Sequence, residues 1–189
     1  MNIEIPSREV TRRIPSVRRF LKPLVERPAD LYVLPKSSAE EFVVSAHGKG
    51  FSNSGTFNTF RFRTVVPNFY AMYYERWKRH YIGKNEYYYL YQAYLHLYHI
   101  DRVNGETEFL LLHCDPNEPK AAAHAIYKQS LHLHIESINA AWPHDIWPHS
   151  HIALNVAYLN TMLTNIESLT HAMEVAIVML KEEVLDLLK

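Results

Sequence analysis

The sequence predicts a single α+β domain over residues 1–189, with an antiparallel sheet of about five strands, a short helix and a long C-terminal helix. Three observations support this fold class. A chain of 189 residues is long enough for one ordinary hydrophobic core and short for two. Alternating apolar and polar residues, typical of strands, recur through residues 40–151. From residue 152 onward, apolar residues recur at the spacing of a helix.

The first 39 residues are expected to form a basic, proline-rich arm. Prolines at positions 6, 15, 23, 28 and 35 limit any helix here to a short piece. The chain is neutral overall, but residues 1–84 carry 15 Lys and Arg against 7 Asp and Glu, and the rest carries 5 against 13. A basic half suggests a nucleic-acid interface, although the two halves could simply neutralise each other in the fold. The candidate phosphate-binding residues are Arg12, Arg13, Arg18, Arg19, Arg61, Arg63, Arg76 and Arg79.

The composition points away from membranes and from secretion. Hydrophobic residues make up 48% of the chain, but no stretch reaches the roughly 18 apolar residues of a membrane span. Charges and prolines occupy the N-terminal stretch where a secretory signal needs an apolar core. The single cysteine, Cys114, excludes an internal disulfide and a cysteine-cluster zinc site. We therefore expect a cytoplasmic protein.

Two strands and one helix are predicted before the tyrosine-rich centre. Residues 41–46 and 57–66 alternate as strands do, and the second places Phe62 and Thr64 on the face opposite to Arg63. Pro67 suits a helix start, and apolar residues at helical steps predict a helix over 67–80. Ten of the 13 tyrosines fall between positions 70 and 98, where they could cover a core edge or stack on bases.

Asn104-Gly105, between two apolar runs, predicts a tight type I′ hairpin. Counting outward from this turn pairs Val103 with Glu106 and His96 with His113. One face would then hold His96 and His113 with Tyr94, Tyr98, Phe109 and Leu111, and the other Leu95, Leu97, Leu110, Leu112 and Cys114.

Two His-x-His pairs are the main candidates for chemistry. Alternation in residues 130–136 places His132, His134 and Glu136 on one face of a strand, and His149 and His151 follow just before the helical pattern. Paired imidazoles could supply nitrogen ligands to a divalent metal ion, with His132, His134, His149 and His151 as the ligands and a carboxylate such as Glu136 or Asp145 completing the shell. Without a metal, one imidazole could act as base and another as acid in phosphodiester cleavage. A satisfied surface or core histidine is the plain alternative.

The C-terminal apolar positions follow a heptad pattern from Ile152 to Leu187, with Thr170 as the polar exception. They predict a long helix over residues 152–188. We expect this helix to pair with a second copy, giving a homodimer, or with a helical partner in a coiled coil. The alternative is a helix interrupted near residues 161–165 that packs against the sheet.

The order of FLLLHCDPN, YKQSLHLHI, WPHSHIAL and a long helix resembles that of small histidine-rich prokaryotic proteins from toxin or defence loci, including TumE-type toxins. The resemblance covers about residues 94–166. It implies a toxic or host-protective role and directs attention to Asp115 and to the histidines at 132, 134, 149 and 151.

Together these features suggest a nuclease-like effector of a toxin–antitoxin or antiviral defence system, which hydrolyses phosphodiester bonds with its histidine cluster. A non-catalytic subunit or antitoxin-like partner of a larger complex is the first alternative. A small-molecule metalloenzyme is the second.

Overall fold

The structure is a computed structural model that describes residues 3–49, 61–103, 105–114, 163 and 165–189, with the strand positions 132–134 and 151–153. The described strands form one antiparallel sheet in the order β2-β3-β5-β6-β7-β8-β9, with β1 beside β6 and β4 beside β5. The predicted α+β class is therefore confirmed. The strands are β1 Glu4–Pro6, β2 Leu31–Ser37, β3 Glu41–Gly48, β4 Phe62–Arg63, β5 Phe69–Ile82, β6 Asn85–Asp101, β7 Gly105–Cys114, β8 His132–His134 and β9 His151–Ala153.

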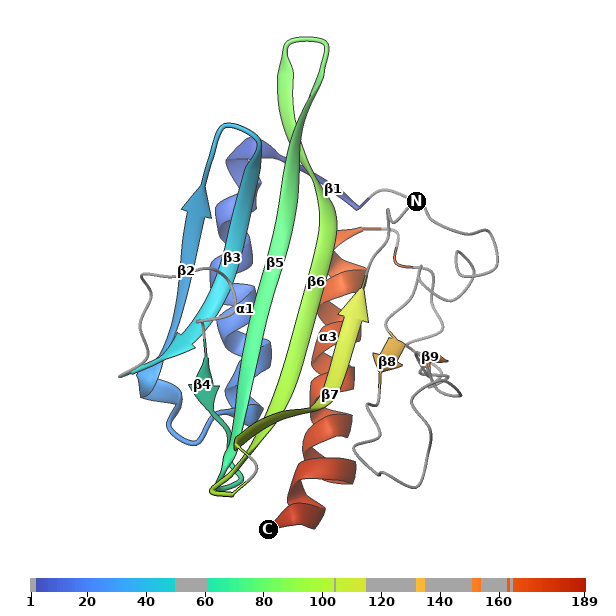
Figure 1. Ribbon diagram of the computed structural model, residues 1–189. Helices are drawn as coiled ribbons and strands as arrows, with labels where there is room; N and C mark the ends of the chain where they lie inside the picture. The colour runs from blue at the N-terminus through green and yellow to red at the C-terminus, as the bar shows by residue number, and fades with distance from the viewer. Residues whose placement is uncertain are drawn as a thin grey trace.

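Two helices lie behind the sheet, on the same face of it (Figure 1). Helix α1 is Arg13–Leu21 and helix α3 is Ile166–Leu180, which continues as a π-helical stretch Lys181–Leu185 and a 3-10 turn Asp186–Leu188. Further 3-10 turns are Ser7–Arg12, Lys22–Leu24 and Pro28–Asp30. The N-terminal segment thus forms short helical pieces, as its prolines predict, and α1 packs against α3 and β2.

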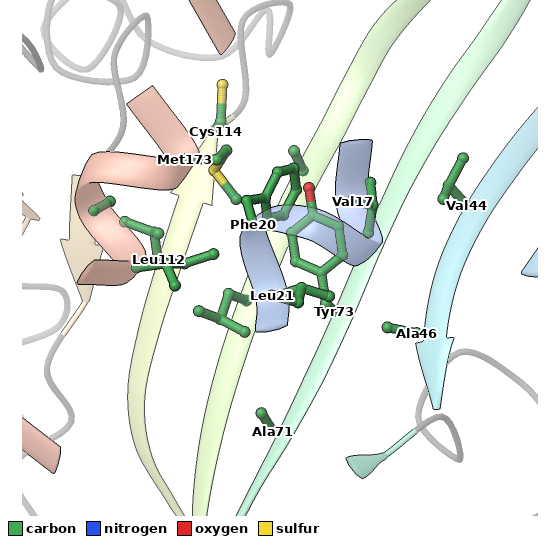
Figure 2. Packing of buried hydrophobic residues seen from close by; sticks show 14 of the residues in the cluster. Val17, Phe20, Leu21, Val44, Ala46, Ala71, Tyr73, Leu112, Cys114 and Met173 are labelled. Atoms are coloured by element: carbon green, nitrogen blue, oxygen red, sulfur yellow. The ribbon is translucent and has the colours of Figure 1, made fainter. Parts of the chain in front are cut away.

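The core fills the space between the sheet and these helices. Figure 2 shows Phe20 and Leu21 of α1, Tyr73 of β5, Leu112 of β7 and Met173 of α3 pointing into one cluster. All five are at most 2% exposed. Leu95, Leu97, Leu110, Leu112 and Cys114 are also buried there, which confirms the predicted core face of β6 and β7.

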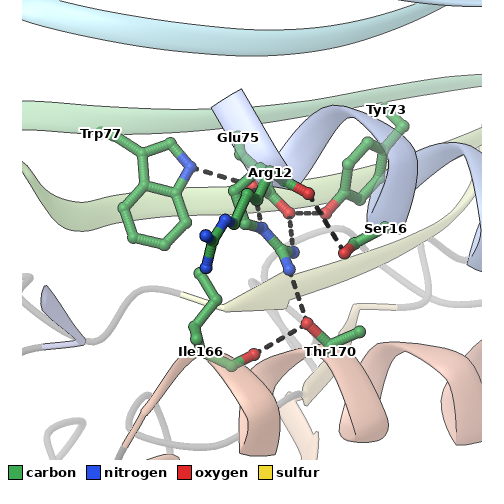
Figure 3. A network of polar contacts seen from close by, with 8 residues as sticks. Arg12, Ser16, Tyr73, Glu75, Trp77, Ile166 and Thr170 are labelled. Atoms are coloured by element: carbon green, nitrogen blue, oxygen red, sulfur yellow. Dashed lines mark hydrogen bonds and ion pairs between the residues drawn. The ribbon is translucent and has the colours of Figure 1, made fainter. Parts of the chain in front are cut away.

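An ion pair lies inside this core (Figure 3). Glu75 of β5 is completely buried and accepts hydrogen bonds from Nε and Nη2 of Arg13, from the Tyr73 hydroxyl at 2.6 Å and from the Trp77 indole N–H at 2.9 Å. The remaining guanidinium nitrogen of Arg13 donates to the Thr170 hydroxyl of α3. One carboxylate and one guanidinium therefore join β5 to both helices.

The pKa values of this cluster keep its charges in place. Burial opposes the charge on Arg13, but attraction and hydrogen bonding from Glu75 outweigh burial and raise the pKa of Arg13. Burial, together with the nearby Glu75 charge, raises the pKa of Tyr73 well above its ordinary value. Tyr73 therefore remains a hydroxyl donor, and Arg13 remains a cation, near neutral pH.

The predicted helix over residues 67–80 is wrong, because residues 69–80 belong to β5. The alternation of Phe69, Ala71, Tyr73 and Trp77 on the core face is interrupted in sequence by Glu75, which resembles a surface residue but is buried with Arg13. Pro67 lies in a turn, where the Phe69 N–H donates to the Val66 carbonyl. Asn68 in this turn has a φ of 65°, a conformation that asparagine tolerates better than most residues.

The predicted continuous helix over residues 152–188 is also wrong in its first part. Ile152 lies in β9, and α3 begins only at Ile166, after a capping box between Asn165 and Ser168. Met173, Ile177 and Leu180 of the heptad stripe are buried in the protein's own core, so they cannot form a seam with a second copy. No helix in the described part of the chain is long and apolar enough to cross a bilayer.

The hairpin register differs from the predicted one. Asp101 pairs with Gly105, and the Asp101 carboxylate accepts from the Val103 N–H at 2.7 Å, so the turn is longer than a two-residue type I′ turn. Further along, Leu97 pairs with Leu110 and Tyr98 with Glu108, which leaves Phe109 as a bulge. His96 consequently lies opposite Leu111, not His113.

The buried ion pair predicts a large effect of substitution. Glu75→Gln would leave the Arg13 charge buried without a counter-ion, and the free energy of unfolding should fall by about 3–5 kcal/mol in urea denaturation. Glu174→Gln is the control, because it removes the exposed partner of Arg19 and should cost less than about 1 kcal/mol. Similar losses in the two variants would contradict the role of Glu75.

Candidate functional site: the histidine face

The sheet face opposite to α1 and α3 carries a band of tyrosine and histidine residues. Tyr74 of β5 pairs with Tyr94 of β6, and Tyr94 pairs with His113 of β7. Two residues along β6, His96 lies on the same face, because successive side chains of a strand alternate. The predicted sharing of one face by His96 and His113 is therefore confirmed, although they are diagonal neighbours and not a direct pair.

The short strands β8 and β9 extend this band. In the register, His132 lies opposite His113, and His134 lies opposite Leu111 on one side and His151 on the other. Directly paired residues belong to the same face of a sheet. The strand positions of these histidines therefore fall on the face of His96. We call this region the histidine face: Tyr74, Tyr94, His96, Tyr98, Glu108, His113 and the strand positions of His132, His134 and His151.

Ring contacts hold the described part of this face together. The rings of Tyr94 and His113 stack with centroids 3.8 Å apart and planes 10° apart. His96 lies 5.2 Å from His113, 5.8 Å from Tyr94 and 6.1 Å from Tyr98, measured between ring centroids. The side chains form a nearly continuous aromatic layer in which His96 and His113 each have an aromatic neighbour.

Glu108 orients His96. The Glu108 Oε1 lies 2.7 Å from Nδ1 of His96, and the His96 side chain is only 13% exposed. A carboxylate can only accept, so Nδ1 donates and the lone pair of a neutral imidazole is left on Nε2. That nitrogen is buried and meets no hydrogen-bond partner within the described part of the chain. Buried polar atoms in proteins are rarely left in this state, and here a carboxylate also orients the ring, so this nitrogen is the strongest candidate for a reacting group.

Tyr98 and Arg61 border this pair. The Tyr98 hydroxyl lies 3.3 Å from Nδ1 of His96, and burial followed by the charge of Glu108 raises the pKa of Tyr98. Tyr98 therefore stays protonated at neutral pH. The Arg61 guanidinium carbon lies 4.0 Å from the centre of the Tyr98 ring, and Arg61 also pairs with Glu106 at 2.6 Å. A cation is thus held at the edge of the histidine face.

The bulge at Phe109 explains why sequence alternation did not identify Glu108. In a regular strand Glu108 would share the core face with Leu110 and Leu112. The extra residue instead places Glu108 opposite Tyr98 on the histidine face, while Phe109 packs edge-on against Phe69 at 5.2 Å. No residue pattern in the hairpin marks this bulge, so Glu108 could not be predicted from the sequence.

The other predicted site residues are placed in part. The structure gives strand positions for His132, His134 and His151, while Glu136, His149 and Asp115 lie outside the described residues. Among the side chains that the structure describes, no three His, Cys, Asp or Glu are arranged to hold a metal ion. A metal site built from these four histidines stays a prediction.

The eight candidate arginines separate onto different surfaces. Arg12, Arg18 and Arg19 belong to the helical layer behind the sheet. Arg13 is 1% exposed and bound to Glu75, so it cannot contact a phosphate in solvent, contrary to our expectation. Arg61, Arg63 and Arg76 border the histidine face, Arg63 through its pairing with Tyr70 and Arg76 through Gln92. Arg79 lies farther along β5, beside Tyr88 and Glu86.

Comparison of the chain with protein-family models, with curated proteins and with solved structures finds no match. The function therefore has to be inferred from the site itself.

His47 gives a pH-dependent prediction for this face. It lies on β3 two residues after Ser45, which pairs with Tyr74, and its ring stacks on Tyr32 at 5.4 Å. Burial lowers the pKa of His47, so near and below its ordinary value of about 6.5 the unfolded chain binds more protons than the folded protein. Stability should fall as the pH drops from about 7 to 5, and His47→Gln should make this fall shallower in urea denaturation. An unchanged pH slope would contradict this expectation.

Proposed function

We propose that this protein is a phosphodiesterase that cleaves single-stranded nucleic acid on the histidine face. The observation that carries the proposal is the Glu108–His96 pair: on a face rich in aromatic rings, it leaves a buried Nε2 with no partner among the described residues. A carboxylate that accepts from one imidazole nitrogen leaves the other free to take a proton, as in hydrolytic sites generally.

The aromatic layer supports a single-stranded substrate. Bases without a pairing partner stack on aromatic side chains, and each such contact contributes about 1–3 kcal/mol to binding. Tyr74, Tyr94 and Tyr98 are half-buried on the histidine face, so the part of each side chain that reaches solvent would meet the bases. Arg61 and Arg63 at the border would contact phosphates. Helix α1 lies behind the sheet (Figure 1), whereas the register places the histidines on the opposite face, so the basic residues of α1 have no part in this site.

The chemistry follows from two neighbouring imidazoles. His96 Nε2 would remove a proton from the attacking hydroxyl, either of water or of the ribose 2′ position. The oxygen would then bond to phosphorus as the bond to the leaving oxygen breaks, and a second, protonated imidazole would give that oxygen a proton. His113, whose ring centroid is 5.2 Å from that of His96, would take this second role.

The biological setting is a further part of the proposal. A toxin or antiviral defence role and a cytoplasmic location are what the sequence and its resemblance suggest, and nuclease activity would suit both. A second copy or another protein remains a proposed partner, but its interface must use residues other than the buried stripe of α3. If the purified protein binds nucleic acid without cutting it, the non-catalytic alternative replaces the nuclease.

Replacement of His96 tests the proposal. His96→Gln should lower the rate of cleavage of single-stranded RNA or DNA oligonucleotides by about 100-fold or more, because general acid–base groups contribute about 10²–10⁴-fold. The melting temperature should change little, since Gln keeps a polar side chain beside Glu108. The measurement is a gel-based rate with end-labelled substrate.

His171→Gln is the matched control. His171 is an exposed histidine of α3, behind the sheet, and its replacement should leave the rate unchanged. A rate that survives in His96→Gln, or falls equally in both variants, would refute the role of the histidine face. Cleavage that requires added divalent metal ion would instead favour the metal-binding role predicted for His132, His134, His149 and His151.

A further inference from the structure

The hairpin between β5 and β6 extends beyond the rest of the sheet (Figure 1). The last pair between β3 and β5 is Glu41 with Lys78, whereas pairing between β5 and β6 continues to Ile82 with Asn85. Gly83, with a φ of 62°, closes the turn and has open space around it. We call residues 79–88 the arm. This arm, which is distinct from the N-terminal segment, shares β5 and β6 with the histidine face. At its base β1 pairs with Tyr87 and Tyr88, and beyond them it is a two-stranded ribbon.

The exposed side chains of the arm are those of Tyr81, Ile82, Lys84 and Asn85. Tyr81 is 63% and Ile82 52% exposed, and Lys84 follows at the tip. At the base of the arm, the Lys78 ammonium lies 3.8 Å from the centre of the Tyr91 ring. Neither Lys78 nor Lys84 forms an ion pair with any residue that the structure describes. Both charges are therefore available to an anion.

A hollow of about 440 Å³ opens where the arm leaves the sheet. Rings of Tyr81 and Tyr89 line it, with the cations Arg76, Lys78 and Arg79 of β5 and the carboxylates Glu40 and Glu41 at the turn between β2 and β3. Glu41 is already paired with Arg76. Arg79 is fixed there, because its Nη2 donates to the Ser38 carbonyl at 3.3 Å and to the Tyr88 hydroxyl at 3.0 Å. Aromatic walls beside cations are the usual surroundings of a nucleotide bound without base pairing.

We propose that the arm and this hollow form a second binding site for single-stranded nucleic acid, which holds the strand while the histidine face acts on it. This inference rests on the function proposed above. Met72, the partner of His96 in the register, and Lys78 are six residues apart on β5, which is about 20 Å at about 3.4 Å per residue. A strand with stacked bases at about 3.4 Å spacing would cover that distance with about six nucleotides.

Lys78, Lys84 and the small exposed apolar area of the arm favour nucleic acid over a protein as the bound partner. Exposed large apolar side chains on the arm are Tyr81 and Ile82, a small area for a stable protein interface. Lys78 and Lys84, which have no counter-ion among the described residues, favour an anionic partner. A β-ribbon with an apolar residue at its tip can also place that residue against a base.

The test is binding as a function of oligonucleotide length. In the His96→Gln background, which keeps the substrate intact, Lys78→Gln with Lys84→Gln should weaken binding of a 12-nucleotide RNA or DNA about tenfold in fluorescence anisotropy. Binding of a 4-nucleotide strand should change less than about twofold, because it is too short to reach both sites. The slope of log affinity against log salt should fall by about 1.4, because each of the two lysines neutralises one phosphate and each phosphate contributes about 0.7.

The matched control removes an equal number of positive charges from the helical layer behind the sheet. Arg18→Gln with Lys22→Gln changes two exposed cations of the α1 region and should leave affinity for both lengths unchanged. Equal losses in the two double variants, or an equal loss for both lengths, would refute the arm site. The arm site would also be refuted if the Lys78→Gln, Lys84→Gln variant kept its nucleic-acid affinity but lost binding to phosphatidylserine vesicles.

The two proposals can fail separately. Length-dependent binding through the arm, with no cleavage by the unaltered protein, would support the arm and refute the hydrolytic function. Cleavage with unchanged affinity in the arm variant would refute the arm alone. An unaltered protein that binds neither RNA nor DNA would refute both.

Discussion

The ion pair between Arg13 and Glu75 joins the sheet to the helical layer. Glu75 accepts hydrogen bonds from Arg13, Tyr73 and Trp77, and Arg13 reaches Thr170 on α3. A pair of this kind is costly to desolvate, and its value lies in fixing one arrangement of the elements that contribute its donors. With α1 and α3 held on one face, the opposite face of β5, β6 and β7 carries the tyrosines and histidines.

Two bulges then shape that opposite face. The bulge at Phe109 brings Glu108 beside His96. The hydrogen bond between the Glu108 carboxylate and Nδ1 of His96 then fixes the orientation of the imidazole ring. The register shift after Arg76 leaves Tyr91 as the extra residue of β6, and Lys78 packs over its ring at the base of the arm. Both bulges redirect side chains, a common use of bulges near functional sites. The candidate chemistry thus depends on irregularities of long strands.

Sequence pattern predicted the features that depend on simple alternation: the α+β class, the core face of β6 and β7, and the common face of His96 and His113. It failed where a buried polar residue or an extra residue breaks the pattern. Glu75 made β5 resemble a helix, because a buried charge cannot be distinguished from a surface charge without its partner, Arg13. The heptad spacing near Met173 predicted an intermolecular seam, but the same spacing serves a helix that packs on its own sheet.

The central claim is that Glu108 holds neutral His96 in the tautomer whose proton is on Nδ1, so that Nε2 carries a lone pair. Long-range ¹H–¹⁵N NMR of histidine-labelled protein, at a pH where His96 is neutral, reports directly which nitrogen carries the proton. We expect the Nδ1–H form for His96, and loss of this preference in Glu108→Ala. A neutral His96 with its proton on Nε2, or a tautomer unaffected by Glu108→Ala, would contradict the claim.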